Sequence, residues 1–213
     1  DSTGKKLYFQ PGTLPNSNAK FLNVIPASFT LQPGESRVLE VILSLPEGQD
    51  RQVTNSMLFV TQVSEKDVVP NKEKKMAAGA IFRVEMGIHI YNEPPQLITK
   101  NIVIEDAQCQ NGVPAKAAPG DSVSQKLTVA SALIGNIGER VTTGNVRFEL
   151  TNKKTLEEWK SEAVEFNTLP GDHFFVNRVL PNTLAKGSYA MITVVDFGAD
   201  QSLKVAESEI EIQ

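Results

Sequence analysis

The sequence is poor in the residues that most often carry chemistry, with one cysteine, one tryptophan and two histidines in 213 residues. Cys109 stands alone, which excludes a disulfide within these residues and leaves the redox compartment undecided. A nucleophilic thiol would need a histidine partner, and neither His89 nor His173 has a spacing relation to Cys109. We therefore expect Cys109 to be a small buried or loop residue.

Catalytic and ligand-binding motifs are also missing. The chain has no glycine-rich phosphate loop, no Gly-x-Ser-x-Gly elbow, and no cysteine or histidine cluster with metal spacing. No run approaches the roughly 20 apolar residues that span a bilayer. The net charge of −4, from 21 basic and 25 acidic residues, offers no concentrated basic surface for nucleic acid. We predict no enzyme activity, no metal or other cofactor, no nucleic-acid partner and no membrane span.

What the sequence does contain is alternation at a period of two. Apolar and polar residues alternate from Phe82 to Tyr91, and Glu93-Pro94-Pro95 follows. Such alternation is typical of a β-strand with one face on a core and the other toward water. Consecutive prolines donate no backbone hydrogen bond and fix φ, so they end the strand and begin a linker. The sequence predicts a domain junction near residues 92–98.

Short β-like runs separated by turn residues make up most of the chain. The clearest turns are Gln32-Pro33-Gly34-Glu35 and Leu169-Pro170-Gly171-Asp172. The polar, lysine-rich stretch from Ser64 to Ala80 predicts a long mobile hairpin loop, and only Thr155–Ala163 could form a short helix. Many short strands with turns every eight to twelve residues or so indicate antiparallel sandwiches. We predict an all-β protein with two domains, residues 1–95 and 96–213.

Two sets of motifs resemble a known family. Val24-Ile25-Pro26, then Phe29–Arg37, a strand, a long loop and the alternating strand before Pro94 resemble the first domain of the periplasmic pilus-assembly chaperones. The second half is similar to C-terminal domains of looser relatives of these chaperones, through Gly144–Leu150, Phe166–Gly171 and Val205–Ile210. The resemblance covers roughly residues 20–213. It implies two immunoglobulin-like antiparallel β-sandwich domains in tandem.

The resemblance also implies a mechanism and a location. In these chaperones, a strand in the last hairpin of the first domain lends its edge and its apolar side chains to an incomplete subunit. The partner implied here is a secreted or pilin-like subunit, or a second copy of the chain, bound by strand pairing. The location implied is the periplasm or the cell surface, after removal of a signal peptide. The positions that correspond in this sequence are Phe82, Val84, Met86, Ile88 and Ile90.

Two features depart from the family pattern. The chaperones hold the subunit's terminal carboxylate with a lysine near the centre of this strand, where this chain has Gly87 or Ile88. Arg83 lies nearby with the right charge and is our candidate anchor for that carboxylate. Fewer than 30 residues precede Phe29, so we expect a shortened first domain that is abbreviated, cut, or completed by another chain.

The sequence alone leaves other interpretations open. The five apolar side chains of the alternating strand could simply face the core of their own domain. The protein could be a structural or adhesion module of an envelope complex that has no client. A carbohydrate-binding module is a weaker alternative, because one tryptophan, Trp159, and three tyrosines offer few stacking platforms. Fold analogy does not separate these functions.

Overall fold

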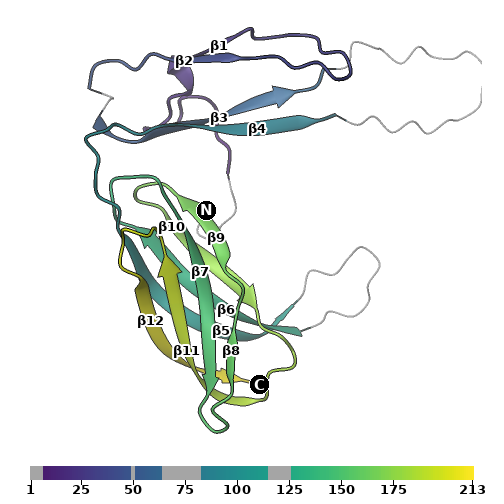
Figure 1. Ribbon diagram of the computed structural model, residues 1–213, viewed down its shortest axis with the longest axis vertical. Coiled ribbons are helices and arrows are strands. Elements are labelled where there is room, and N and C mark those ends of the chain that lie inside the picture. The colour runs from purple at the N-terminus through teal and green to yellow at the C-terminus, as the bar shows by residue number, and fades with distance from the viewer. Residues whose placement is uncertain (1–6, 49–50, 64–82, 115–125) are drawn as a thin grey trace, which may run out of the picture. The chain divides into compact units, whose positions relative to one another are not determined.

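The computed structural model describes residues 7–48, 51–63, 83–114 and 126–213 (Figure 1). Every regular element in these residues is an antiparallel β-strand except for one short 3-10 turn, η1 (Ala19–Phe21). The prediction of an all-β, antiparallel protein is confirmed. Among the described residues, no helix is long and apolar enough to cross a membrane.

The chain forms two compact units that divide between Pro94 and Pro95. We call Phe9–Pro94 the N-terminal unit, and Pro95–Gln213, with which Tyr8 is grouped, the C-terminal unit. The division falls one residue before the predicted boundary, at the double proline that was expected to end the alternating strand. The predicted hairpin loop from Ser64 to Ala80 lies outside the described residues.

Two sheets form the C-terminal unit. One has the strand order β10-β6-β5, and the other has the order β12-β11-β7-β8, with β9 also paired to β7 (Figure 1). The strands of the first sheet are β5 (Ile102–Pro114), β6 (Lys126–Asn136) and β10 (His173–Val179). Those of the second are β7 (Thr142–Asn152), β8 (Glu158–Lys160), β9 (Val164–Thr168), β11 (Gly187–Asp196) and β12 (Lys204–Ile212).

Alternation in these strands builds one apolar core. On β7, the side chains of Val146, Phe148 and Leu150 are at most 1% exposed, while the residues between them are more accessible. The alternating residues of β6, β11 and β12 join the same cluster. Trp159 packs against this cluster, partly buried, and stands opposite Leu150 in the register. Trp159 therefore contributes to the packing of this core.

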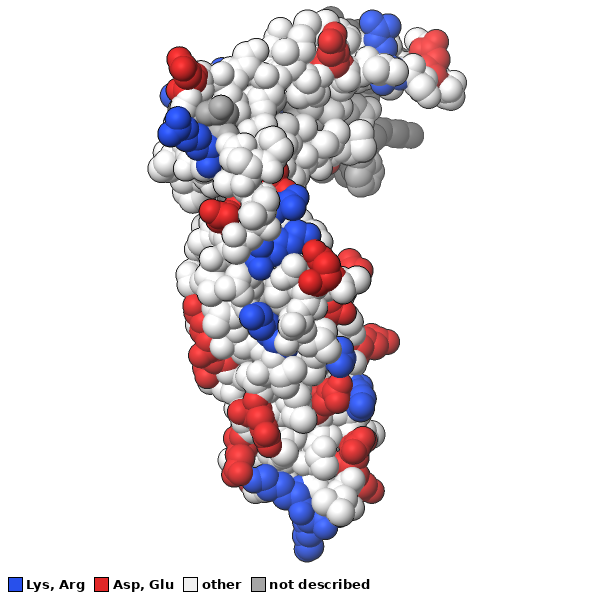
Figure 2. All heavy atoms as spheres, turned by 60° about the vertical axis from the view of Figure 1, so that its left-hand side comes forward, with Lys and Arg blue, Asp and Glu red and all other residues white. Residues whose placement is uncertain are grey.

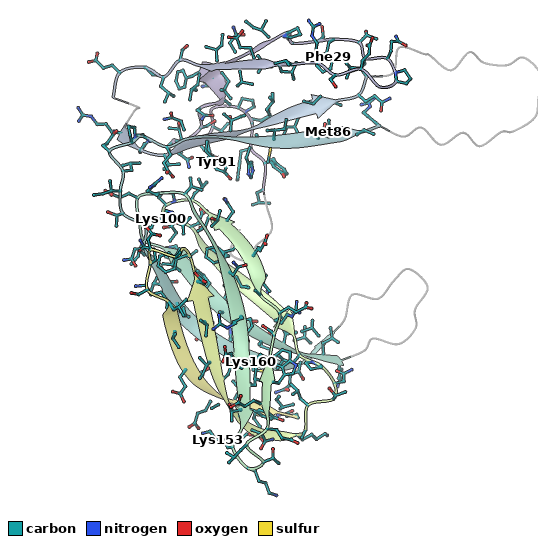
Figure 3. All side chains as sticks on the ribbon, in the orientation of Figure 1. Phe29, Met86, Tyr91, Lys100, Lys153 and Lys160 are labelled. Carbon is teal, nitrogen blue, oxygen red and sulfur yellow. The ribbon has the colours of Figure 1, made fainter. Side chains whose placement is uncertain are left out.

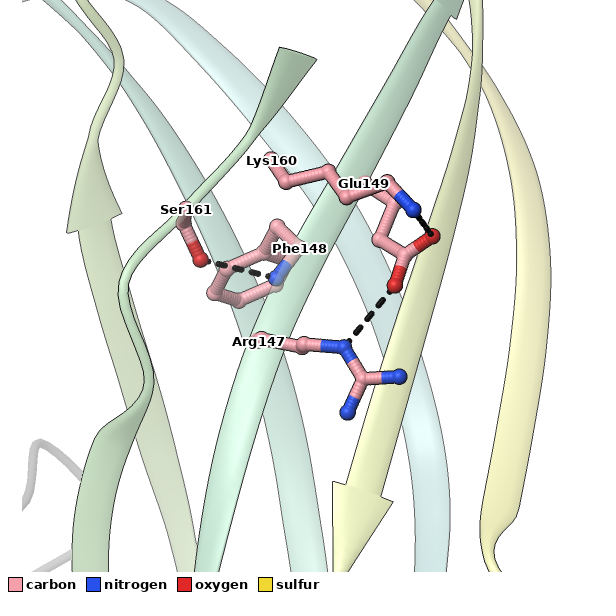
Figure 4. Close-up of polar contacts among 5 residues, drawn as sticks. All are labelled: Arg147, Phe148, Glu149, Lys160 and Ser161. Carbon is pink, nitrogen blue, oxygen red and sulfur yellow. Dashed lines mark hydrogen bonds and ion pairs between the residues drawn. The ribbon is translucent and has the colours of Figure 1, made fainter. Parts of the chain in front are cut away.

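The prediction of a short helix at Thr155–Ala163 is wrong, because part of this segment pairs with β7 as strand β8. Leu156, with φ 61°, interrupts any helical continuation, since a left-handed conformation is unfavourable for a leucine. Ser161, just after β8, extends the pairing with β7. Its amide donates to the Phe148 carbonyl at 2.8 Å, and its hydroxyl accepts from the Phe148 amide at 2.9 Å, the bond drawn in Figure 4. Tertiary pairing has overridden local propensity.

The N-terminal unit has much less core. Its strands form two separate pairs, β1 (Leu22–Ile25) with β2 (Glu40–Leu43) and β3 (Thr54–Thr61) with β4 (Glu85–Asn92). Val53 is the single hydrophobic residue that is buried among the described residues of this unit. Apolar side chains of this unit stay accessible, including Phe29 between β1 and β2 and Met86 on β4 (Figure 3). A two-stranded sheet is marginally stable on its own, so the described residues of this unit supply fewer strands than a stable sandwich needs.

The two Pro-Gly turns have the same construction. Glu35 N–H donates to the Gln32 carbonyl at 3.0 Å, and the Glu35 carboxylate accepts from the Gln32 amide at 2.8 Å. In the C-terminal unit, Asp172 makes the equivalent two bonds to Leu169 at 3.1 and 2.8 Å. Both turns are confirmed, with a glycine at positive φ as the third residue in each.

Candidate functional site

The outer edge of β4, at Glu85 and Gly87, is the candidate site in the N-terminal unit. β3 pairs with one edge of β4, and no other strand in the described part of the chain pairs with it. The amide of Gln62 donates to the carbonyl of Val84 at 2.8 Å, so Val84 and the alternate residues after it bond to β3. The backbone groups of the residues between them, such as Glu85 and Gly87, therefore point away from β3.

One face of this strand carries the predicted apolar row. Val84, Met86 and Ile88 are 56%, 57% and 48% exposed, and Ile90 is half-buried. Phe82, the fifth predicted position, lies outside the described residues. The outer part of the row is thus accessible, and only its inner end is shielded by the unit itself.

β3 extends the same apolar face. Val60 stands opposite Met86, and Leu58 stands opposite Ile88. In an antiparallel pair, opposite residues lie on the same side of the sheet, so these four side chains form one continuous surface. Sequence pattern alone does not reveal this contribution, because the run Met57–Val60 is apolar on both faces and shows no alternation.

Buried polar side chains mark the inner end of the apolar face. Thr54 and Ser56 follow Leu58 along it, and Asn18 contacts Thr54, with 3.5 Å between Nδ2 and Oγ1. Asn18 Oδ1 and Ser56 Oγ are buried and have no hydrogen-bond partner among the described residues. Buried polar atoms of this kind are costly in an apolar setting. The usable apolar row therefore runs outward from Ile90.

The opposite face of β4 is crowded at its centre. A Cβ atom added at Gly87 would lie 3.1 Å from Met57 Sδ and 3.3 Å from Phe59 Cε1. Next to it, the Tyr91 hydroxyl and His89 Nδ1 are 2.8 Å apart, and their rings meet edge to face. Gly87 has no side chain to carry a charge, whereas the pilus-assembly chaperones have a lysine near this position. The candidate anchor Arg83 is exposed and precedes β4 by two residues.

Other polar clusters do not assemble a reactive centre. The described residues contain no group of three or more His, Cys, Asp or Glu side chains that could hold a metal ion. Cys109 is half-buried on β5, and burial raises the pKa of its thiol. A raised pKa disfavours the nucleophilic thiolate. His173 Nδ1 lies 2.8 Å from a carboxylate oxygen of Glu105, so this histidine pairs with a carboxylate and not with Cys109.

A cluster of three charged side chains lies on the outer face of β7 and β8. Glu149 accepts from Arg147 Nε at 2.8 Å, and Lys160 Nζ lies 3.2 Å from its other oxygen (Figure 4). The hydrogen bond from Arg147, aided by Lys160, holds the pKa of Glu149 below its usual value. Figure 2 shows acidic and basic side chains interspersed over this unit. Such mixed charge suits a solvated outer face rather than a binding site for one ion.

Comparisons with known proteins add no assignment to this site. The chain matches no family model, no curated protein and no solved structure.

Proposed function

We propose that this chain is a non-catalytic, chaperone-like protein with two immunoglobulin-like domains, which acts in the periplasm or at the cell surface. It binds a secreted or pilin-like subunit by adding a strand to the outer edge of β4. The observation that carries this proposal is the combination of an edge that no described strand covers with the exposed row Val84, Met86 and Ile88. Main-chain hydrogen bonds would give affinity, and the apolar row would give selectivity.

The shape of the N-terminal unit supports strand addition. In its described residues each sheet has two strands, and three or more strands with an apolar face are needed for an independently stable sheet. A strand added at β4 extends the β3–β4 sheet and shelters apolar side chains that are otherwise in water. Binding would therefore stabilise the unit as well as the partner.

The sheets of the C-terminal unit support the immunoglobulin-like assignment. Three strands in one sheet face a second sheet with β12, β11 and β7, and the interior side chains of both alternate with outward polar ones. This two-layer antiparallel arrangement is typical of immunoglobulin-like sandwiches. We assign the two domains to residues 1–95, in shortened form, and 96–213.

A peptide-binding experiment tests the proposed function. The probe is a fluorescein-labelled peptide of nine residues that alternates valine or isoleucine with threonine or lysine. We expect the full chain to bind it, measured by fluorescence anisotropy. N-methylation of every second residue, on the edge that would face β4, should abolish binding, whereas N-methylation of the intervening residues should not. Equal binding of both methylated peptides, or no binding of the parent peptide, would refute strand addition.

Two variants define where the peptide binds. Glu85→Pro removes an N–H that points away from β3 and leaves the backbone bonds to β3 in place, although it also removes the side-chain bond from Thr61 Oγ1. We expect peptide binding to be lost. Arg83→Ala should remove any preference for a peptide with a free terminal carboxylate over the amidated form. Unchanged binding by the Glu85→Pro chain would place the peptide elsewhere.

A further inference from the structure

Asn111 and Gly112 form the one Asn-Gly pair in the sequence. Such a pair is chemically reactive, because glycine has no side chain to shield its backbone nitrogen from the asparagine before it. The glycine nitrogen attacks the side-chain amide carbon Cγ, ammonia leaves, and a cyclic succinimide forms. Water then opens the ring to give an aspartate or an isoaspartate. Whether the pair reacts in a folded protein depends on what holds its two reacting groups.

The pair lies at an irregular point of β5. The register with β6 shifts between Gln110 and Val113, so in the part of the chain that the structure describes Asn111 and Gly112 stand outside the ladder with β6. Gly112 is exposed, with φ 74°, and a Cβ atom added there would have Lys126 Cδ as its nearest neighbour, at 4.0 Å. The attacking nitrogen therefore belongs to an exposed and sterically open residue of the bulge.

The side chain of Asn111 is fixed by both ends of its amide. Nδ2 donates to the Glu211 carbonyl at 2.7 Å, and Oδ1 accepts from Thr128 Oγ1 at 3.1 Å and from the Gln213 amide at 3.4 Å. The amide must turn toward the nitrogen of Gly112 before Cγ can be attacked, and these bonds oppose that rotation. The reaction thus requires the side chain to leave its partners.

Two of these partners lie at the end of a strand. Glu211 is the last residue but one of β12, and Gln213 follows the strand. The ends of strands open locally at a lower free energy than the centre of a core. The contact with β12 therefore slows the reaction of Asn111 without preventing it.

Conversion of Asn111 to an acid changes this contact. The product loses the N–H donor, so a carboxylate oxygen faces the Glu211 carbonyl oxygen, and neither supplies a proton for a hydrogen bond. Ile210 and Ile212, on either side of Glu211, are buried in the core of the sandwich. A weaker contact at Glu211 consequently loosens a segment that carries core side chains.

We propose that Asn111 is a deamidation site that β12 protects while the sandwich is closed, and that its conversion loosens β12. The reaction consumes water, releases ammonia and needs no other reactant. It adds a negative charge and is not reversed by refolding, so the change is one-way. The site lies in the C-terminal unit, and this inference is independent of the function proposed for β4.

Peptide mapping by mass spectrometry measures the reaction. The full chain is incubated in mildly alkaline buffer, folded or unfolded in urea, and the acid formed at Asn111 is followed over time. We expect the unfolded chain to react at least about tenfold faster, because the folded chain must first open at β12. Thr128→Val removes the hydroxyl that holds Oδ1 and should speed the reaction of the folded chain, whereas Thr128→Ser keeps the hydroxyl and should not. Equal rates in the folded and unfolded chains would overturn protection by β12.

The consequence of the reaction is tested on its product. The deamidated chain, purified from the first experiment, and the Asn111→Asp chain should both unfold at a lower urea concentration than the native chain. Their β12 amides should also exchange hydrogen faster, while those of β9 keep the native rate. Gln110→Glu is the matched control, because it adds the same charge at an exposed neighbour on β5 and should leave both measurements unchanged. A deamidated chain with native stability and native exchange on β12 would overturn the loosening.

Discussion

The side-chain amide of Asn111 donates a hydrogen bond to the backbone carbonyl of Glu211 at 2.7 Å, and so joins β5 to β12. These strands belong to different sheets of the C-terminal unit. Asn111 lies in a register shift of β5, before Gly112 at φ 74°. Bulges of this kind redirect side chains, and here the redirected amide closes one side of the sandwich. Its Oδ1 also accepts from Thr128 Oγ1 at 3.1 Å.

We expect Asn111→Ala to lower the free energy of unfolding by about 1–3 kcal/mol, since it removes these bonds and leaves their partners unpaired. Urea unfolding followed by fluorescence of Trp159 gives the value. Gln110→Ala is the matched control, because Gln110 is an exposed neighbour on the same strand, and it should change stability by less than about 0.5 kcal/mol. Equal effects of the two substitutions would show that the bonds to β12 contribute nothing.

Removing a buried hydroxyl from the core should raise the free energy of unfolding rather than lower it. Thr193 is fully buried on β11 in line with Met191 and Val195, and its Oγ1 has no hydrogen-bond partner among the described residues. We expect Thr193→Val to raise the free energy of unfolding by about 1 kcal/mol, because it removes an unsatisfied polar atom and keeps the shape. Thermal and urea unfolding measure the change.

Thr142→Val is the control for that experiment. Thr142 is also fully buried, but its hydroxyl donates to the Arg140 carbonyl at 3.2 Å. The same substitution should therefore destabilise by about 1 kcal/mol. If both variants lost stability, the Thr193 hydroxyl would have a partner after all.

Much of the C-terminal unit follows from local sequence. The alternating run Val146–Leu150 became the centre of β7, and the two Pro-Gly turns formed as expected. β5 is longer than its local sequence indicates: Ile102–Ile104 is a clear β-like run, yet the strand continues to Pro114. The Asn111-Gly112 pair suggests a loop, and only its contact with β12 makes it a bulge within a strand. Such a partner cannot be found from local pattern.

The candidate site was predicted in part. Alternation located β4 and its apolar row, because a period of two is a local property. How much of the row is exposed depends on the strands packed against it, and the sequence alone left that question open. Asn18 illustrates the limit, since its burial against Thr54 joins residues far apart in the chain.

The charged cluster at Glu149 predicts a dependence on pH. Its pKa is lowered in the folded chain, first by the hydrogen bond from Arg147, so folding favours the ionised carboxylate. That contribution is present above the ordinary glutamate pKa of about 4.3 and is lost as the pH falls through the lowered value. We expect Glu149→Gln to lose less stability than the native chain between neutral and acidic pH. Urea unfolding at several pH values measures this, with Glu158→Gln, an exposed glutamate on β8, as the control.

Gly144 lies where β7 passes close to other groups. An added Cβ would collide with the carbonyl of Asp196 and lie 2.7 Å from Phe166 Cζ. We expect Gly144→Ala to destabilise the C-terminal unit by about 1–3 kcal/mol, because the backbone carbonyl cannot move aside without disturbing β11. Thr143→Ala, which introduces an alanine at the exposed neighbouring position of β7, is the control. A Gly144→Ala chain with native stability would mean that β7 shifts freely at this point.

The sharpest distinction between core and binding surface comes from two apolar positions. Phe148 is fully buried in the C-terminal unit, and Phe148→Ala should cost about 3–5 kcal/mol because it leaves a cavity. Met86 is 57% exposed, so Met86→Asp should leave the unfolding transition within about 0.5 kcal/mol of the native one. The same Met86→Asp chain should lose binding of the alternating peptide, because the carboxylate would be placed against an apolar side chain of the added strand without a polar partner. Fluorescence anisotropy with the labelled peptide and urea unfolding of the same sample separate these effects. A Met86→Asp chain that unfolds would show that the apolar row belongs to the unit's own core, and one that is folded and still binds the peptide would remove the row from the binding surface.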